Sequence, residues 1–246
     1  MARGKHIDHI LREWAYDPAT VKVRLCQGAD GRDVLQMRLD MGILQLETHG
    51  RPDGSQPHGY ETYLDYLISR TASAGDAFRL DEEQCGEVDR EFVQFYHRRV
   101  CWLKLQSFRS VVDDADHTLA LMDFCRRHSP GEQWTAAHER HRPLVLFHRT
   151  QASALAELEQ QGPVAAVHEV NRGLQQMQQL FREQEQDTCF EDDVLVQRLS
   201  QLRESLRQEY GVGRTLQEQL ADAVAAEEYE LAARLRDRLA RRQRRS

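Results

Sequence analysis

Near the start of the chain, apolar and polar side chains alternate in three short runs, residues 21–26, 34–39 and 43–48. A period of two is typical of β-strands that bury one face, and Gly-Ala-Asp-Gly at 28–31 favours a turn between the first two runs. We therefore predict a small antiparallel β meander. Its apolar face has to be covered, and a helix is the usual cover.

After about residue 60 the apolar positions recur every three to four residues, which predicts α-helices. The expected helices cover residues 60–71, 81–108, 111–125, 134–161, 164–186 and 192–210, followed by two shorter ones. Breaks are expected at His-Ser-Pro-Gly (128–131) and Gly-Pro (162–163), and a kink at Pro143. The predicted fold class is therefore mainly α, with a small N-terminal antiparallel β meander.

Two of the expected helices share an apolar pattern at a shift of 55 residues. In this alignment Val111, Ala115, Thr118, Leu119 and Met122 correspond to Ala166, Val170, Gly173, Leu174 and Met177. Small residues where helices cross are typical of tetratricopeptide-like (TPR-like) hairpins, although the standard unit is about 34 residues long. A degenerate TPR-like array and an irregular helical bundle both stay open.

The predicted organisation has three parts. Residues 1–75 form a small α+β segment with the meander, and residues 76–190 form a helical array. Residues 191–246 form a long helix followed by a C-terminal helical hairpin.

The hairpin is predicted from two short amphipathic patterns. Leu216, Leu220, Ala223 and Val224 follow the spacing i, i+4, i+7, i+8, and Tyr229, Ala232, Ala233, Arg236 and Leu239 share a second helix face. Alanines let two helices approach closely, and we expect Tyr229 to close the turn by packing on the first helix. Two helices this short bury too little surface to be stable alone, so the hairpin has to dock on something.

The residues that identify this hairpin are Leu216, Leu220, Ala223, Glu228-Tyr229-Glu230, Ala232-Ala233, Leu235-Arg236-Asp237 and Leu239. Over about residues 206–243 the pattern resembles the UVR motif. That motif is shared by the UvrB and UvrC excinuclease subunits, some Clp-type chaperone ATPases and the activator of protein-arginine kinases. The resemblance implies pairing of two hairpins into a four-helix arrangement. The expected partner-binding residues are Leu216, Leu220, Ala223, Tyr229, Ala232, Ala233, Arg236 and Leu239.

The resemblance makes a non-catalytic adaptor or scaffold the leading functional expectation. The hairpin's partner would be a matching hairpin of another protein, a second copy of this chain, or the body of the same chain. Related partners are a UvrB/UvrC-type subunit, a Clp-type ATPase or a protein-arginine kinase. The zinc-binding cysteine pairs of the kinase activator are missing here, and no ATPase motif is present. The alternative is an accessory factor in nucleotide excision repair that recruits UvrB/UvrC-type nuclease machinery.

Charge is distributed unevenly. Residues 234–246 hold seven arginines and one aspartate, a net charge of +6, so the remaining chain carries −13 of the total of −7. An acidic body is repelled by phosphates, which disfavours direct DNA binding by the whole chain. Arg241, Arg242, Arg244 and Arg245 are the candidates for a nucleic-acid or acidic-partner contact. Cations near a helix C-terminus also suit the helix dipole, which is the simpler explanation of the tail.

No motif predicts catalysis, a cofactor or a metal ion. Two groups have partly metal-like spacing, namely Asp113, Asp114, Asp116 and His117, and then His138, His141 and His148, but further ligands are not apparent. The Gly-rich stretches lack phosphate-binding spacing, and no G-x-S-x-G occurs. We expect a protein without enzyme activity. No apolar run reaches membrane-spanning length and no signal-peptide pattern is apparent, so the expected location is cytoplasmic.

Overall fold

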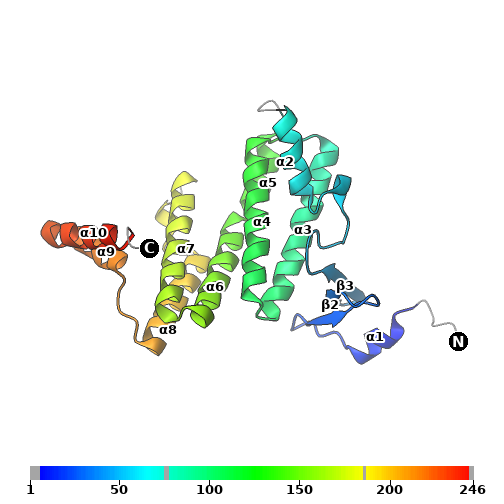
Figure 1. The fold of residues 1–246 in the computed structure, drawn as a ribbon, viewed down its shortest axis with the longest axis horizontal. Coiled ribbons are helices and arrows are strands. Elements are labelled where there is room, and N and C mark those ends of the chain that lie inside the picture. Colours follow the sequence, from blue (N-terminus) through cyan, green and yellow to red (C-terminus); the bar gives the residue numbers. More distant parts are fainter. Residues whose placement is uncertain (1–5, 75–77, 185–186, 244–246) are drawn as a thin grey trace.

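The structure is a computed structural model that describes residues 6–74, 78–184 and 187–243. Its N-terminal elements are α1 (Asp8–Glu13), β1 (Val23–Gln27), β2 (Asp33–Leu39), β3 (Gly42–Glu47), η1 (Pro57–Gly59) and α2 (Tyr63–Ala74). The body contains α3 (Glu82–Lys104), α4 (Phe108–Arg127), α5 (Glu132–Glu139), α6 (Arg142–Gln160), α7 (Pro163–Glu183), η3 (Asp187–Cys189) and α8 (Val194–Tyr210). The chain continues into α9 (Leu216–Ala225) and α10 (Tyr229–Gln243). Figure 1 shows the sheet at one end, the helices side by side, and the α9–α10 hairpin at the other end.

The predicted meander is confirmed, because β1, β2 and β3 form an antiparallel sheet in sequence order. Leu35, Met37 and Leu46 are buried on one face of this sheet. They pack against a cluster from the helices that contains Cys101, Trp102, Val111 and Ala152. The apolar face is thus covered by helices, as the alternation requires.

Polar side chains of the sheet bond mostly to one another. Arg24 donates to Gln36 at 2.7 Å, and Gln36 donates to Gln45 at 2.9 Å. Arg38 is buried and donates to the backbone oxygen of Trp14 at 2.7 Å. Arg38 therefore ties the sheet to the segment that precedes it.

Most helices lie where the sequence predicts them, with two differences. The helix expected over residues 81–108 ends at Lys104, and α4 already begins at Phe108. The helix expected over residues 134–161 is two helices, α5 and α6, and Pro143 lies in the first turn of α6. The predicted kink is wrong because a first-turn proline sacrifices no intrahelical hydrogen bond and so can start a new helix.

The helices of the body pack in a row. The packed pairs are α3 with α4, α4 with α6, α6 with α7, and α7 with α8 (Figure 1). The two patterns that match at a shift of 55 residues lie on α4 and α7, and both of these helices pack on α6. Most of the matching residues are buried. The correspondence is therefore between two buried helix faces, and its assignment to a TPR-like repeat stays a prediction, as does the division at residues 75 and 190.

Gly173 of α7 lies in close contact with α6. A Cβ atom placed there would lie 2.1 Å from the Oγ1 atom of Thr150 on α6. No real carbon atom fits at that distance, so the crossing of α6 and α7 requires a residue without a side chain. This explains the glycine inside an otherwise regular helix.

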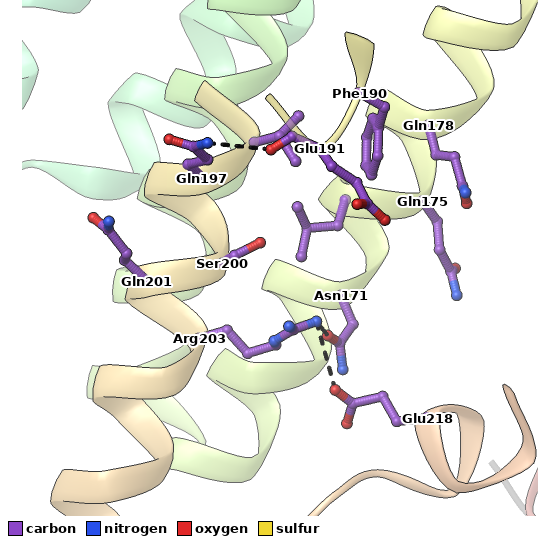
Figure 2. A pocket seen from close by; sticks show the side chains of 12 residues that line it. Asn171, Gln175, Gln178, Phe190, Glu191, Gln197, Ser200, Gln201, Arg203 and Glu218 are labelled. Atoms are coloured by element: carbon purple, nitrogen blue, oxygen red, sulfur yellow. Dashed lines mark hydrogen bonds and ion pairs between the residues drawn. The ribbon is translucent and has the colours of Figure 1, made fainter. Parts of the chain in front are cut away.

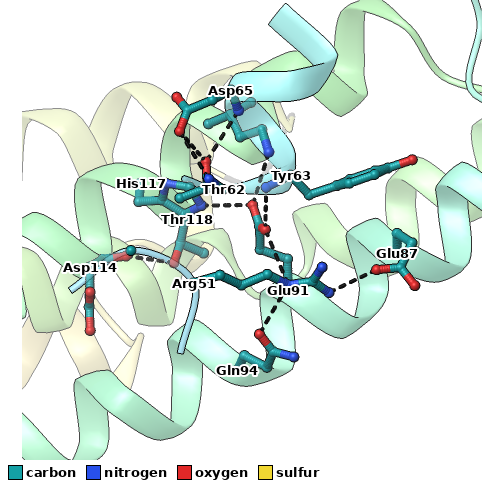
Figure 3. Close-up of polar contacts among 12 residues, drawn as sticks. Arg51, Thr62, Tyr63, Asp65, Glu87, Glu91, Gln94, Asp114, His117 and Thr118 are labelled. Carbon is teal, nitrogen blue, oxygen red and sulfur yellow. Dashed lines mark hydrogen bonds and ion pairs between the residues drawn. The ribbon is translucent and has the colours of Figure 1, made fainter. Parts of the chain in front are cut away.

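A buried carboxylate fastens α2 to the array (Figure 3). Glu91 of α3 has no exposed surface and accepts hydrogen bonds from the backbone N–H groups of Tyr63 (2.7 Å) and Leu64 (3.1 Å). His117 Nε2 of α4 lies 3.0 Å from the same carboxylate. Because the first N–H groups of a helix have no partner within it, Glu91 caps α2 from another helix.

Two buried arginines fasten the loop after β3 to the helices. Arg51 reaches Glu87 at 2.8 Å (Figure 3), and Arg98 pairs with Asp114 at 2.7 Å. Arg98 also donates to the backbone oxygen of Gly50 at 2.7 Å. Paired charges therefore join the N-terminal segment to α3 and α4.

Candidate interaction site in the C-terminal hairpin

The first turn of α9 is fixed by a capping box. Glu218 N–H donates to the side-chain oxygen of Thr215 at 3.3 Å, and Thr215 N–H donates to the Glu218 carboxylate at 2.8 Å. This reciprocal pattern satisfies two otherwise unpaired N–H groups. The sequence that starts the hairpin is therefore Thr-Leu-Gln-Glu at 215–218.

Contacts between the hairpin and the body gather at this same turn. Arg207 of α8 donates to the Glu218 carboxylate, and Arg203 lies 3.6 Å from it. Arg203 also donates to Asn171 of α7 at 3.2 Å. Burial alone would raise the pKa of Glu218, but the hydrogen bonds from Thr215 and Arg207 outweigh it and the pKa is lowered. The hairpin is thus joined to the body at one end.

A small apolar seam holds α9 against α10. Ala223, Ala232 and Leu235 are buried in it, with Leu216 and Leu220 packed against them. Alanine at two of these positions allows the close approach that the sequence predicts. Leu235 belongs to the motif but was not expected among the contact residues, and its spacing of three from Ala232 is the signal that places it on the same face.

The expected packing of Tyr229 on α9 is wrong. The turn is closed by the backbone, since Glu227 adopts a left-handed conformation (φ 58°) and Glu228 N–H donates to the Ala223 oxygen at 2.8 Å. Tyr229 is then directed outward and is 69% exposed. Because the backbone closes the turn, the aromatic ring of Tyr229 is not needed for it and is available for contact with a partner.

An outward face of the hairpin carries several apolar groups. Tyr229, Ala233 and Arg236 are exposed and follow i, i+4, i+7 along α10. Leu231 (43% exposed) and Val224 (53% exposed) are further apolar side chains near the turn. Val224 was expected on the same inner face as Ala223, but only a narrow stripe of α9 faces α10, and Val224 lies outside that stripe. We call Val224, Tyr229 and Leu231 the tip residues.

The structure separates the predicted contact residues into two groups. Ala223 and Ala232 are buried in the seam, Leu216, Leu220 and Leu239 are partly buried, and Tyr229, Ala233, Arg236 and Arg241 are exposed. The side chain of Arg242 and the residues Arg244 and Arg245 lie outside what the structure describes. Sequence reasoning missed Leu231 as a candidate contact residue. The signal that could have identified it is a large apolar side chain within the motif, close to the turn.

A groove of about 560 Å³ lies between α7, α8 and the first turn of α9 (Figure 2). Many of its lining side chains are uncharged and polar, namely Asn171, Gln175, Gln178, Gln197, Ser200 and Gln201. Arg203 and Glu218 lie at the hairpin end of the groove. Amides and hydroxyls of this kind can exchange hydrogen bonds with a peptide backbone.

The residues with metal-like spacing are engaged elsewhere. Asp114 pairs with Arg98, Asp116 pairs with Arg149, and His138 Nε2 lies 2.8 Å from Asp89. Within residues 6–74, 78–184 and 187–243, no group of three or more His, Cys, Asp or Glu is placed to hold a metal ion. None of the helices described there is long and apolar enough to cross a membrane.

Comparison with known proteins agrees with the geometry of the hairpin. A family model described as the UvrB/uvrC motif matches residues 214–244. The match begins one residue before the N-cap Thr215, later than the expected start near residue 206, because residues 206–210 belong to α8. No curated protein matches the chain, and no solved structure does. The C-terminal hairpin is therefore a UVR motif, a protein-interaction module, attached to a helical body.

Proposed function

We propose that this protein is a non-catalytic adaptor whose UVR hairpin pairs with a second helical hairpin. The observation that carries the proposal is the group of exposed apolar side chains at the hairpin turn, Val224, Tyr229 and Leu231, with Tyr229 69% exposed. Exposed tyrosine with neighbouring apolar side chains is typical of contact surfaces. In the described residues, the apolar seam between α9 and α10 is formed instead by Ala223, Ala232 and Leu235.

The size of the hairpin supports the same proposal. Helices of 10 and 15 residues are marginal in water without tertiary packing. The described contacts with the body gather at the first turn of α9, so most of α10 is left without cover from the body. Pairing with another hairpin into a four-helix arrangement would bury the tip residues and stabilise both hairpins.

The partner proposed is a protein that carries a matching hairpin, in a cytoplasmic setting. A UvrB/UvrC-type subunit, a Clp-type ATPase, a protein-arginine kinase and a second copy of this chain are the candidates. The UVR match itself favours a second function, namely an accessory role in nucleotide excision repair. In that role the hairpin would recruit nuclease subunits, and the acidic body would stay away from DNA.

The experiment compares the full chain with a variant carrying Tyr229→Asp and Leu231→Asp. Native lysate is passed over each, and bound proteins are identified by mass spectrometry, while sedimentation velocity gives the oligomeric state of each. The control is Val164→Asp, which places the same charge at an exposed apolar site (49% exposed) on α7. We expect a hairpin-bearing partner or a self-association that the tip variant loses and the control keeps. Identical partners and oligomeric state for all three proteins would refute the proposal.

Direct DNA contact by the basic tail has its own test. Anisotropy of a labelled duplex is measured at low and high salt with the full chain and with Arg241, Arg242, Arg244 and Arg245 changed to Gln. Binding that weakens with salt and disappears in the variant would support the contact. No binding at low salt would restrict the repair role to protein recruitment.

A further inference from the structure

A second hollow lies far from the hairpin, between α3, α4 and the junction of α5 with α6. Its volume is about 350 Å³, within the range of about 300–1,000 Å³ that is usual for ligand pockets. Much of the wall is apolar, formed by Phe92, Met122, Leu144 and Val145. One cationic side chain, Arg99, lines the same hollow.

Arg99 is only 2% exposed, and its charge is unpaired. The guanidinium donates to the Thr118 hydroxyl at 2.9 Å and reaches the backbone oxygen of Asp114 at 3.5 Å, while its Nε atom is buried without a partner. In the part of the chain that the structure describes, no carboxylate pairs with it. Its neighbour Arg98, by contrast, pairs with Asp114 at 2.7 Å. A buried cation without an anion is unfavourable unless something else neutralises it.

The groups around the hollow compensate that charge only in part, because the Asp114 carboxylate attracts Arg99 but forms its ion pair with Arg98. Burial lowers the pKa of Arg99 to about 10, which still leaves it protonated at neutral pH. His148 of α6 has its pKa lowered to about 4 by burial and by the charge of Arg99, so it is neutral there. The carboxylate of Asp89 lies 2.8 Å from His138 and is therefore engaged by that side chain and not by Arg99. The hollow therefore combines an apolar wall with a positive charge that is only partly compensated.

We propose that this hollow binds a small amphipathic carboxylate. The carboxylate oxygens accept hydrogen bonds from the guanidinium of Arg99, and the apolar tail lies against Phe92, Met122 and Leu144. A charge-assisted hydrogen bond in a site with little water is stronger than a neutral one. A neutral ligand of the same shape fills the apolar space but leaves Arg99 unpaired.

The test uses octanoate and 1-octanol, which share an apolar chain and differ in charge. Binding to the full chain is measured by calorimetry and by the change in melting temperature. We expect octanoate to bind about tenfold or more tightly than 1-octanol. Equal binding of the two, or binding of neither, would overturn the proposal. Tighter binding of an apolar peptide with a free C-terminal carboxylate than of octanoate would overturn its assignment to a small molecule.

Two variants separate a ligand-binding role of Arg99 from a structural one. Arg99→Met should weaken octanoate binding about tenfold and leave the melting temperature unchanged or higher, because it removes an unpaired buried charge. Arg90→Met removes an exposed charge from the same helix and should bind octanoate like the parent chain. A lower melting temperature with octanoate binding intact would show that Arg99 is structural.

A third variant covers the case in which Arg99→Met does not fold. Val93 lines the hollow and is 54% exposed, so Val93→Glu places a carboxylate near the opening without disturbing the core. It should weaken octanoate binding and leave 1-octanol binding unchanged. Unchanged octanoate binding in this variant would also overturn the proposal.

Discussion

Arg207 near the end of α8 donates a hydrogen bond to Glu218 in the first turn of α9. Glu218 closes the capping box of α9 with Thr215 at the same time. One carboxylate therefore both starts the UVR hairpin and joins it to the helical body.

Removing that carboxylate should loosen the hairpin. Glu218→Ala loses one half of the capping box and leaves Arg207 with Glu204 alone, which costs about 1–2 kcal/mol of local stability. We expect faster amide hydrogen exchange in α9 and α10, with the exchange of α6 and α7 unchanged. Glu230→Ala, an exposed carboxylate of α10, is the control. The folded pKa of Glu218 lies below its ordinary 4.5, so its contribution is complete above that pH and is lost as pH falls through the folded value.

The two leucines at the start of α10 should have opposite roles. Leu235 is buried in the seam, so Leu235→Ala should cost about 2 kcal/mol and speed amide exchange in the hairpin more than tenfold. Leu231→Ala, at an exposed site, should leave exchange unchanged and weaken partner capture. Similar exchange rates in the two variants would contradict the assignment of the inner and outer faces.

Gly173 should be intolerant of even one added methyl group. Gly173→Ala forces a clash with Thr150 and should destabilise the protein by about 1–3 kcal/mol in urea unfolding. Adding Thr150→Ala should recover much of the loss. Gly86→Ala, in an open part of α3, should instead stabilise by about 0.5–1 kcal/mol. Equal effects at the two glycines would mean that α6 and α7 lie further apart.

Charge on Glu91 should be needed for stability. Glu91→Gln keeps the shape but removes the carboxylate that caps α2 and faces His117 and Arg51. Because a neutral amide is a weaker acceptor than a carboxylate for the two buried N–H groups of α2, urea unfolding should show a loss of about 2 kcal/mol. Glu82→Gln, exposed on the same helix, should change stability much less. A loss confined to α2, seen as local amide exchange, would instead assign Glu91 to capping alone.

Acid should weaken the fold through His148. Burial and the charge of Arg99 lower its pKa to about 4 from 6.5, so the unfolded chain takes up a proton first as pH falls. The stabilising contribution of neutral His148 is present above about pH 6.5 and declines towards pH 4. His148→Asn, which cannot take up that proton, should flatten the stability curve over this interval. An unchanged slope would mean that His148 is freely protonated in the folded protein.

The local elements and the motif could be predicted from the order of the residues alone. Alternation gave the three strands, and Gly162-Pro163 marked the boundary between α6 and α7, because glycine and proline act on the backbone wherever they stand. The UVR motif could also be recognised from the sequence, because a match to a motif depends only on the order of residue types.

Which side chains face one another depends on how the helices pack, and could not be predicted from the sequence. Both faces of the hairpin carry alanine or apolar residues, so periodicity did not show that Ala223 is buried while Tyr229 points outward. Arg98 and Arg99 are adjacent and chemically identical, yet Arg98 forms an ion pair with Asp114 while Arg99 donates to the Thr118 hydroxyl. Their side chains leave α3 about 100° apart, so each meets different neighbours. Contacts of this kind join residues far apart in the chain, and the packing of the helices fixes them.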